Sequence, residues 1–592
     1  MNYKSLDEAA ALVDAQMAAD PSIQDQARAI LEAAKAGDCG APFGALDTLK
    51  AFRDADLPGW MRLRSELKRA KVQVTELDRA MRDTSESAGA EAIADALVAL
   101  ARAHAEFVHD ADGEPYAVMH EEGIRRCLHL GSKAFGEWLS FKFYRDTDRA
   151  PADQALKTAL ATLTGQAKFD GKEASVHLRV AKTEDGVYWL DLCDEEWRCV
   201  RIDRHGWSIH QGGDAPLFTR TGSMRALPEP VRGGDIGALW ALVNVPEADR
   251  LHVLAFLVEA LRPDTPYPVL LMFGGQGTGK SSTHSMLRDL FDPNQVNLRA
   301  APKTVEDMWV AARGSHVVSY ENLSHLTPAQ QDALCTIATG GGTATRTLFT
   351  TADETVIQVK RPVMLNGIAA VVTAQDLIDR AILIELPTVT SRRTGGAIQA
   401  AFDAERPRLV GALLDLFSRA LEVLPSVEID PASLPRMADF TLIGEAVARA
   451  TGHAPGVFLA SYSAMRVESV HRTIEASPVG AAIVAMMENL PRVFDGTVQD
   501  LMTALADYRP AGESWPMTAK GMGDALRRLA TSMKLIGIDI HDKGRTRRGY
   551  AVRISRPGEL GVNMVNLVNV EKSGTPPEKK IGPGSDLHRE VL

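Results

Sequence analysis

The spacing of apolar residues divides the chain into regions of different character. In residues 1–110 apolar positions recur at helical spacing, which predicts amphipathic helices. The helical stretches are LDEAAALVDAQ (6–16), ALDTLKAFRDADLPGWMRLRSELKRA (45–70) and AEAIADALVALARAHAEF (90–107). Pro58-Gly59 and Ser85–Gly89 are expected to break this helical region.

Residues 111–234 contain short segments in which apolar and polar residues alternate. Such alternation predicts half-buried strands, and the turn residues between the segments favour antiparallel pairing. The segments are ASVHLRVA (174–181), VYWLDLC (187–193) and RCVRID (198–203). The sequence therefore predicts a small α/β domain, with its strands at roughly residues 165–220.

Residues 235–425 alternate helical patterns with short apolar runs, which is typical of an α/β domain around buried parallel strands. The runs are PVLLMF (268–273), SHVVSY (315–320), RPVMLNGI (361–368) and AILIEL (381–386). A helical lid or linker is predicted for residues 426–476.

The pattern of residues 477–556 predicts three helices, at 479–490, 497–506 and 518–536, followed by two strands in IDIHDKGRTRRGYAVRIS (538–555). Helices before a two-stranded wing favour a winged-helix domain that binds DNA through phosphates. Its candidate DNA-binding residues are Lys520, Arg527, Arg528, Lys543, Arg545, Arg547 and Arg548. A solvated surface or a protein contact is the alternative for these charges. Residues 557–592 are predicted to be a disordered tail.

Composition narrows the function classes. The 592-residue chain has a net charge of −11, so nucleic acid can be contacted only by a local basic surface. Its five cysteines form no zinc or disulfide pattern, which favours reduced thiols. No secretory signal and no apolar run near the ~20 residues of a membrane span are visible. We therefore expect a cytoplasmic protein.

The strongest chemical motif is GGQGTGKS, which fits G-x-x-x-x-G-K-[ST] and follows an apolar strand and precedes a helix. This strand–loop–helix arrangement presents backbone N–H groups to a triphosphate, so ATP and Mg²⁺ are the expected ligands. Lys280 should reach the β and γ phosphates and Ser281 should ligate Mg²⁺. The residues expected to bind the nucleotide are Gly274, Gly275, Gln276, Gly277, Thr278, Gly279, Lys280, Ser281 and Ser282.

Polar residues at the ends of later strands are candidates for catalysis. Glu321 can hold Mg²⁺, whereas Asn322 stands where a water-activating carboxylate is common, so hydrolysis is slow or another group orients the water. Asn366 can bond the γ-phosphate or the attacking water. Arg380 occupies the place from which ring ATPases present an arginine finger to a neighbouring subunit. The alternatives are a surface acid for Glu321 and an ion pair with Asp376 or Asp379 for Arg380.

The order of these motifs resembles a family of phage and integrated-element ATP-binding proteins related to superfamily 3 helicases and primase–helicases. The resemblance rests on GGQGTGKS, VVSYENLS, LCTIATGGG, RPVMLNGI and DLIDRAI and runs from about residue 95 to 465. It implies an AAA+-like ATPase core, a homo-oligomer that forms a hexameric ring, and translocation on DNA. It assigns Lys280 and Ser281 to the P-loop, Glu321 to Walker B, Asn366 to sensor 1 and Arg380 to the finger.

Three features depart from this family. Glu321 stands where relatives usually carry Asp, and no primase signature is evident. The hairpin expected before Asn366 has the acidic tip Asp353-Glu354, which would repel phosphate, and its basic residues, Arg346 and Lys360, lie on the stems instead.

Two functions remain open from the sequence, beside a scaffold in which nucleotide only stabilises the ring. The first is an oligomeric ATP-dependent DNA helicase or translocase in replication of a phage or mobile element. The second is an ATP-dependent DNA-binding switch, such as an initiator or a defence-related ATPase, with weak hydrolysis and no unwinding. In either case the N-terminal helices could contact other replication proteins.

Overall fold

The computed structural model describes residues 21–121, 123–213, 215–346, 354–390, 393–475, 477–489, 493–509 and 515–556. The chain divides into two compact units, Met1–Val176 and His177–Leu592. The helix predicted at 6–16, the tail 557–592 and the hairpin tip around Asp353 lie outside the described residues. Within the described ranges, no helix is both long enough and apolar enough to cross a membrane.

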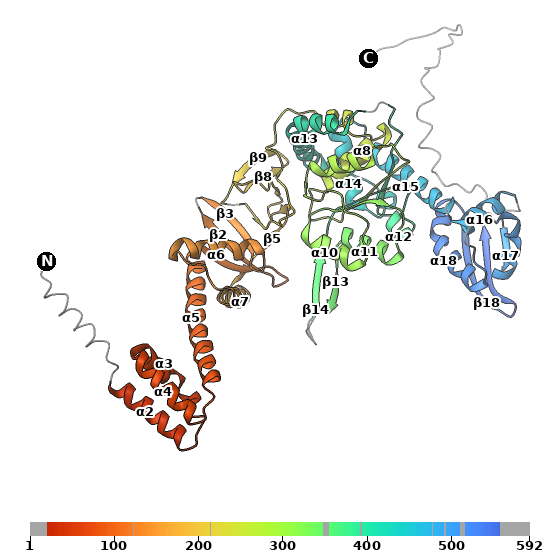
Figure 1. Ribbon diagram of the computed structural model, residues 1–592. Coiled ribbons are helices and arrows are strands. Elements are labelled where there is room, and N and C mark those ends of the chain that lie inside the picture. Colours follow the sequence, from red (N-terminus) through yellow and green to blue (C-terminus); the bar gives the residue numbers. More distant parts are fainter. Residues whose placement is uncertain are drawn as a thin grey trace, which may run out of the picture. The chain divides into compact units, whose positions relative to one another are not determined.

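The first unit contains a helical part and an α/β part (Figure 1). Its helices are α2 (Pro21–Lys35), α3 (Leu46–Ala55), α4 (Leu57–Arg69), α5 (Val74–His104), α6 (Lys133–Thr147) and α7 (Asp153–Phe169). Its strands are β1 (Ala105–His109), β2 (Pro115–Glu121), β3 (Ile124–His129) and β4 (Lys172–Glu173), in the order β3-β2-β1-β4. One core joins α2, α3, α4 and the start of α5, and a second packs α5, α6 and α7 on the sheet.

The helix boundaries of this unit correct two expectations. The predicted break at Ser85–Gly89 is wrong, because α5 runs through it. Serine and glycine each weaken a helix by at most about 1 kcal/mol and do not impose a turn. The other break falls at Asp56, whose carboxylate accepts from the Gly59 N–H at 2.8 Å and caps α4. Pro58 lies in the first turn of that helix, where its missing N–H costs no hydrogen bond.

The β-structure also begins earlier than predicted, at Ala105 inside a stretch expected to be helical. Strand β2 is buried at five consecutive positions, and β3 carries Arg125 and Arg126 on partly buried positions. Neither strand shows the alternation of apolar and polar residues by which half-buried strands are recognised, so the pattern did not reveal them.

The second unit begins with small sheets. Strands β6 (Val180–Lys182), β7 (Tyr188–Asp191), β8 (Arg198–Asp203) and β9 (Gly206–Gln211) form an antiparallel sheet. The antiparallel pairing predicted here is confirmed, but only the last residues of the segment 174–181 enter this sheet, and β9 was not among the predicted segments. Strands β5 (Val176–His177) and β10 (Leu217–Phe218) pair beside it.

The centre of the second unit is a parallel sheet in the order β12-β15-β11-β16. Its strands are β11 (Val269–Phe273), β12 (Val318–Leu323), β15 (Val363–Gly367) and β16 (Ala381–Glu385). All four apolar runs are therefore confirmed as strands of one parallel sheet, and the mixed α/β class with them.

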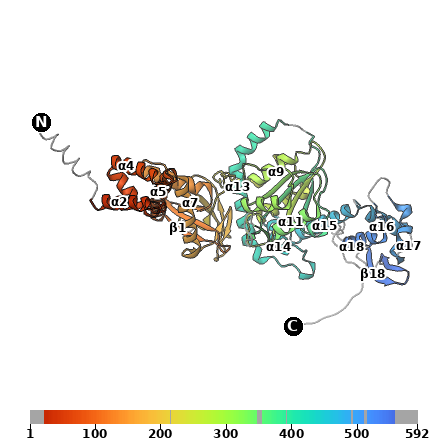
Figure 2. The same ribbon diagram turned by 60° about the horizontal axis from the view of Figure 1, so that its bottom comes forward.

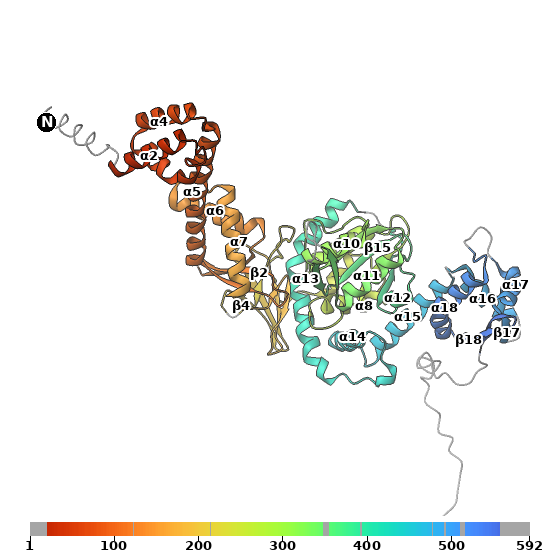
Figure 3. The ribbon, with the colours of Figure 1, turned by 90° about the horizontal axis from the view of Figure 1, so that it is seen from below.

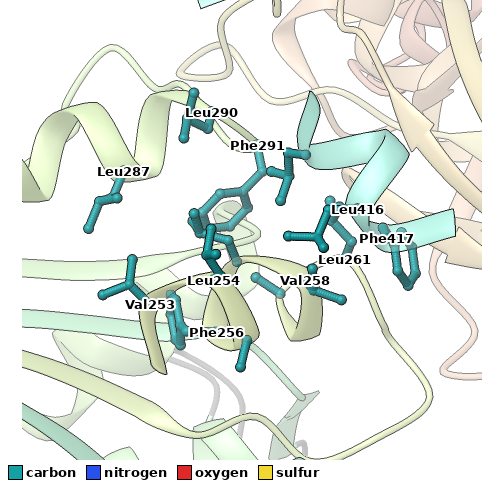
Figure 4. Packing of buried hydrophobic residues seen from close by; sticks show 14 of the residues in the cluster. Val253, Leu254, Phe256, Val258, Leu261, Leu287, Leu290, Phe291, Leu416 and Phe417 are labelled. Carbon is teal, nitrogen blue, oxygen red and sulfur yellow. The ribbon is translucent and has the colours of Figure 1, made fainter. Parts of the chain in front are cut away.

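Helices cover both faces of this sheet (Figures 1 and 3). One face packs on α8 (Arg250–Glu259), α9 (Lys280–Asp289), α13 (Gly395–Val423) and α14 (Ala438–Ala450). Figure 4 shows apolar side chains of the first three of these helices meeting in that core. The other face packs on α10 (Val305–Gly314), α11 (Pro328–Thr339), α12 (Gln375–Ile378) and α15 (Val457–Glu475).

A hairpin follows α11. Its strands are β13 (Gly341–Arg346) and β14 (Glu354–Val359), which pair antiparallel. Helix α11 ends at Thr339, and Gly340 follows it with a φ of +94°. The next two glycines already belong to β13, so the strand begins before the expected stem at 346.

The C-terminal part contains α16 (Pro478–Asn489), α17 (Val498–Ala504), α18 (Ala519–Leu535) and a three-stranded sheet (Figure 2). The sheet has the order β17-β19-β18, with β17 (Val493–Thr497), β18 (Asp539–Thr546) and β19 (Gly549–Ser555). The sequence predicted the three helices and two of these strands but missed β17. This strand is short and mostly exposed, so its pattern carries little signal.

Candidate functional site

The glycine-rich loop lies between β11 and α9, at the carboxyl edge of the parallel sheet. Gly274, Gly277 and Gly279 have φ values of +151°, +80° and +72°, which L side chains rarely adopt. A Cβ at Gly274 would lie 2.7 Å from the main-chain oxygen of Leu386, after β16. The loop therefore needs glycine both for its turns and for its close approach to the neighbouring chain.

Lys280 extends back over this loop. Its Nζ donates to the main-chain oxygens of Gly274, at 2.8 Å, and Gly275, at 2.7 Å. Partial burial lowers the pKa of the ammonium group. Thr278 is buried beneath the loop and donates to Gly275 O at 3.1 Å. Gly275, Gln276, Gly277 and Ser282 are exposed, so the outer surface of the loop is open to a ligand.

Asn244 is a residue that the sequence did not single out. Its side-chain amide donates to the main-chain oxygens of Thr278, at 2.9 Å, and Pro387, at 2.6 Å. These bonds tie the loop to the segment that follows β16. Only the tertiary structure reveals this role, because 34 residues separate Asn244 from Thr278.

The two predicted metal ligands meet. The Ser281 hydroxyl, in the first turn of α9, donates to Glu321 Oε2 at 3.1 Å. Glu321 lies near the end of β12, where the pairing with β15 shifts register between Tyr320 and Leu323. This irregularity lifts Glu321 and Asn322 out of the regular ladder, as bulges do next to many sites.

Asn322 has a left-handed backbone with φ of +53° and an exposed side chain. Its N–H donates to the side-chain oxygen of Asn366 at 2.9 Å. Asn366 lies on β15 as predicted but is fully buried, and its Nδ2 lies 2.8 Å from His284 Nδ1. The structure thus places Asn366 against the strand end that carries Glu321.

Arg380 directly precedes β16, as expected, but its guanidinium is bound within its own chain. Nη1 contacts the Asp376 carboxylate at 2.6 Å and the Asp376 main-chain oxygen at 2.7 Å. The side chain is only 13% exposed. Asp376 also pairs with Arg436 at 2.6 Å. The ion pair with Asp376, which the sequence left open as the alternative, is therefore present.

The two basic residues assigned to the hairpin stems lie at the end of β13 and directly after β14. Arg346 is paired in register with Glu354, and its side chain lies outside the described part. Lys360 follows β14 at the base of the hairpin, and its methylenes lie 3.5 Å from where a Cβ on Gly340 would be. Partial burial lowers its pKa.

The seven basic residues predicted in the C-terminal part are all exposed. Lys520, Arg527 and Arg545 border one groove of about 430 Å³ between α18 and the β18–β19 hairpin. Two of the seven have acidic partners, because Arg527 pairs with Asp524 and Lys543 pairs with Asp495. The apolar residues of α18, Leu526, Leu529 and Met533, are buried in the core.

The fold and site define a mixed α/β protein whose parallel sheet carries a glycine-rich strand–loop–helix turn. Residues 236–468 match the family model described as "Actinomycete integrative conjugative element replication protein", and residues 479–568 match "AICE RepA C-terminal domain". Together these matches cover more than half of the chain. These matches show that the protein is a replication protein of a mobile element.

Solved structures of the "NrS-1 C terminal region" share only 11–13% identity with the chain. One of them covers 78% of this chain and 98% of its own, with a TM-score of 0.36. A second covers 77% and 97%, with a TM-score of 0.34. No curated protein matches the sequence significantly.

Proposed function

We propose that the protein is a Mg²⁺-dependent ATPase that acts on DNA, as a helicase or translocase, in replication of its mobile element. The observation that carries this proposal is the 3.1 Å contact between Ser281 and Glu321 beside the Lys280 loop. This contact brings together, at the carboxyl edge of the parallel sheet, a phosphate-binding loop, Lys280 and two oxygen ligands of the kind that Mg²⁺ prefers. Neither the loop nor the acid would suffice alone.

The residues at this site fit a nucleoside triphosphate. The exposed N–H groups of the loop and the N-terminus of α9 attract phosphate oxygens. Lys280 would exchange the two main-chain oxygens it now contacts for the β and γ phosphates. Ser281 and Glu321 would hold Mg²⁺, which neutralises charge on the phosphates during transfer. Within the described residues, no group of three or more His, Cys, Asp and Glu is arranged to hold a metal, so the phosphates would complete the coordination.

The residue after Glu321 limits the expected rate. An amide cannot accept a proton from the attacking water, so Asn322 can at most orient it through hydrogen bonds. The chemistry would then depend on positioning and charge stabilisation, which dominate phosphoryl transfer in any case. Slow turnover without DNA is therefore expected.

DNA would bind to the C-terminal part, which we propose to be a winged helix. Helix α18 and the β18–β19 hairpin both expose basic side chains, and three of these border one groove. Such an arrangement suits contacts with phosphates on both sides of a groove of the duplex.

Assembly into a homo-oligomer, a hexameric ring by family resemblance, would bring Arg380 to a neighbouring nucleotide. Arg380 must first leave Asp376. Mixing Arg380→Ala subunits with Lys280→Ala subunits tests this role. If Arg380 acts in trans, the mixture hydrolyses ATP faster than either variant alone; no rescue would remove the finger from the proposal.

A second function, the ATP-dependent DNA-binding switch with weak hydrolysis and no unwinding, is favoured by the state of Arg380. With 13% exposure and a bound carboxylate, its guanidinium is not presented for catalysis. In this function ATP would tighten DNA binding, and turnover would only reset the protein.

The deciding experiment measures ATP turnover and nucleotide affinity with and without single-stranded and duplex DNA. In the helicase or translocase, DNA stimulates turnover, and Lys280→Ala abolishes it. Because Lys280 Nζ contacts only atoms of the loop, this variant should keep the melting temperature of the wild type. Lys157→Ala, an exposed lysine on α7, is the matched control. ATP-tightened DNA binding without strand separation would select the switch, and absence of nucleotide binding would refute both functions.

DNA binding is tested by the salt dependence of duplex affinity in the full chain. Arg545→Ala should weaken binding to all sequences and reduce the salt slope by about one. Lys157→Ala, an exposed lysine on α7 outside the proposed DNA-binding part, is the matched control. Equal slopes in the wild type and Arg545→Ala would contradict the assignment of the hairpin.

A further inference from the structure

His284 lies one turn after Lys280 on α9, and it is fully buried. Its two ring nitrogens connect two strands of the parallel sheet. Nδ1 lies 2.8 Å from Asn366 Nδ2 on β15, and Nε2 lies 2.9 Å from Ser319 Oγ on β12. The imidazole therefore connects α9, which begins at the glycine-rich loop, to two strands of the sheet. These are β12, which carries Glu321, and β15, which carries Asn366.

The hydrogen bonds run in one direction. The Ser319 hydroxyl donates to Asn297 O at 2.7 Å, so it accepts from His284 Nε2–H. Nδ1 then carries a free lone pair and accepts from Asn366 Nδ2–H. The Asn366 oxygen is left to accept the Asn322 N–H. In this series of hydrogen bonds each donor faces an acceptor.

This direction requires a neutral imidazole. Burial, helped by the nearby charge of Arg288, lowers the pKa of His284 to about 3, so the ring is uncharged at neutral pH. If Nδ1 were also protonated, its N–H would point at the N–H of Asn366 Nδ2. Two donors would then face each other with no acceptor between them. The neutral ring also fixes the orientation of the Asn366 amide, because a flipped amide would oppose both of its neighbours.

This series of hydrogen bonds contacts β12 on both sides of Glu321. Ser319 lies two residues before Glu321, and Asn322 follows it directly. Between Tyr320 and Leu323 the regular pairing with β15 is interrupted, so the ladder does not hold this segment on the β15 side. On its other side the Glu321 N–H donates to Arg299 O at 2.8 Å. The Asn366 side chain supplies the missing acceptor, and His284 holds that side chain in place.

We propose that His284 is a positioning residue that links the start of α9 to the carboxylate of Glu321 through Asn366 and Ser319. Ser281 and His284 are three residues apart on α9. If α9 shifts when the loop takes up a ligand, Ser281 moves with the helix. Glu321 then moves with Ser281, because His284 connects α9 to the residues on both sides of Glu321. The consequence for metal and turnover rests on the proposed function. The effect on the backbone of Asn322 does not.

A buried histidine can also be simply structural, and the same unit offers such a case. His252 is 2% exposed, and its Nε2 lies 3.1 Å from the Ser461 hydroxyl. Its ring packs against Phe458 with centroids 5.7 Å apart, within the core on the α8 side of the sheet. His252→Leu thus removes a buried histidine–serine bond of the same kind that does not reach β12.

The first measurement needs no nucleotide. Hydrogen exchange of the Asn322 amide is followed by mass spectrometry in wild type, His284→Leu, His284→Gln and His252→Leu. In His284→Leu the Asn366 amide loses its anchor, so exchange at Asn322 should rise roughly tenfold, the effect of one lost hydrogen bond. His284→Gln retains a donor and an acceptor and should restore part of the protection. His252→Leu should leave this amide unchanged.

The second measurement uses the site. In His284→Leu the Mg²⁺ concentration that half-saturates turnover should rise roughly tenfold, as when the support of a metal ligand is removed. Affinity for ATP without Mg²⁺ should stay near that of the wild type, because the loop is untouched. A purely structural role would instead lower the amplitudes of turnover and of ATP binding together, in proportion to the folded fraction, and would leave the half-saturating Mg²⁺ concentration unchanged.

The results separate the two proposals. Unchanged exchange at Asn322 in a folded His284→Leu protein overturns the positioning role, whatever the protein hydrolyses. If His284→Leu does not fold, His284→Gln and Ser319→Ala replace it, and unchanged Asn322 exchange in Ser319→Ala has the same meaning. If the wild type binds no nucleotide, the proposed function fails while the exchange measurement still decides on His284.

Discussion

The left-handed backbone of Asn322 gives a sharp test of why an asparagine follows Glu321. With φ of +53°, this position penalises most L residues by about 1–2 kcal/mol, whereas asparagine and glycine tolerate it. Asn322→Ala should therefore lower the free energy of unfolding by about 1 kcal/mol. In Asn322→Gly the loss of strain and the greater freedom of the unfolded chain oppose each other, so the net change should stay below about 0.5 kcal/mol.

The two variants also separate conformation from chemistry. Only the main-chain N–H of Asn322 is bonded to Asn366, and both variants retain that group. If asparagine is present for its backbone, Asn322→Gly should keep ATP turnover within about threefold of wild type, far from the 10²–10⁴-fold that proton-transfer groups contribute.

The assays are urea denaturation, read by far-ultraviolet circular dichroism, and steady-state ATP turnover at saturating Mg²⁺. Asn322→Gly with wild-type stability but turnover reduced tenfold or more would refute this reasoning, because the side-chain amide would then act on the water. Equal stability of Asn322→Ala and Asn322→Gly would refute the conformational part.

Three further predictions concern the loop, a buried ion cluster and acid sensitivity. Gly274→Ala places a Cβ 2.7 Å from a main-chain oxygen at a φ of +151°, so nucleotide affinity should fall at least about tenfold, and wild-type affinity in a titration would contradict this. Asp292→Ala leaves two fully buried arginines without their carboxylate and should cost about 3–5 kcal/mol in urea denaturation; a loss under about 1 kcal/mol would be inconsistent with it. Burial lowers the pKa of His316 to about 4, so its stabilising effect is complete above the unfolded pKa near 6.5 and is lost as pH falls towards 4. Stability should therefore drop less between pH 8 and 5.5 in His316→Gln than in wild type, by about 1.4 kcal/mol, and an equal drop would contradict the assignment.

The sequence predicted the parts of the site that are encoded locally. The run before Gly274 is apolar at every position and the glycines follow at fixed spacing, so strand, loop and helix are visible within about fifteen residues. Glu321 was found because it ends an apolar run, and strand ends meet at one edge of a parallel sheet. Their contact at 3.1 Å agrees with that inference.

The parts that the sequence did not reveal depend on contacts between distant segments. His284 lies on the same side of α9 as Lys280, a spacing that helical periodicity could have flagged, but its partners lie 35 and 82 residues away. Asn244 supports the loop from outside every motif. The left-handed backbone of Asn322 arises from an irregularity in strand pairing, which no local pattern announces.

The geometry of Arg380 connects the two proposed functions. Asp376 binds Arg380 and Arg436 together, and Arg380 keeps a further bond to the Asp376 main chain, so a single subunit holds its guanidinium away from solvent. A triphosphate on a neighbouring subunit carries more negative charge than one carboxylate and could draw Arg380 out, since Arg436 would still compensate Asp376. In this scheme the isolated chain would bind ATP and hydrolyse it slowly, as the proposed switch requires. Turnover would rise only where a neighbour brings its own nucleotide, so assembly on DNA, rather than ATP binding, would set the rate.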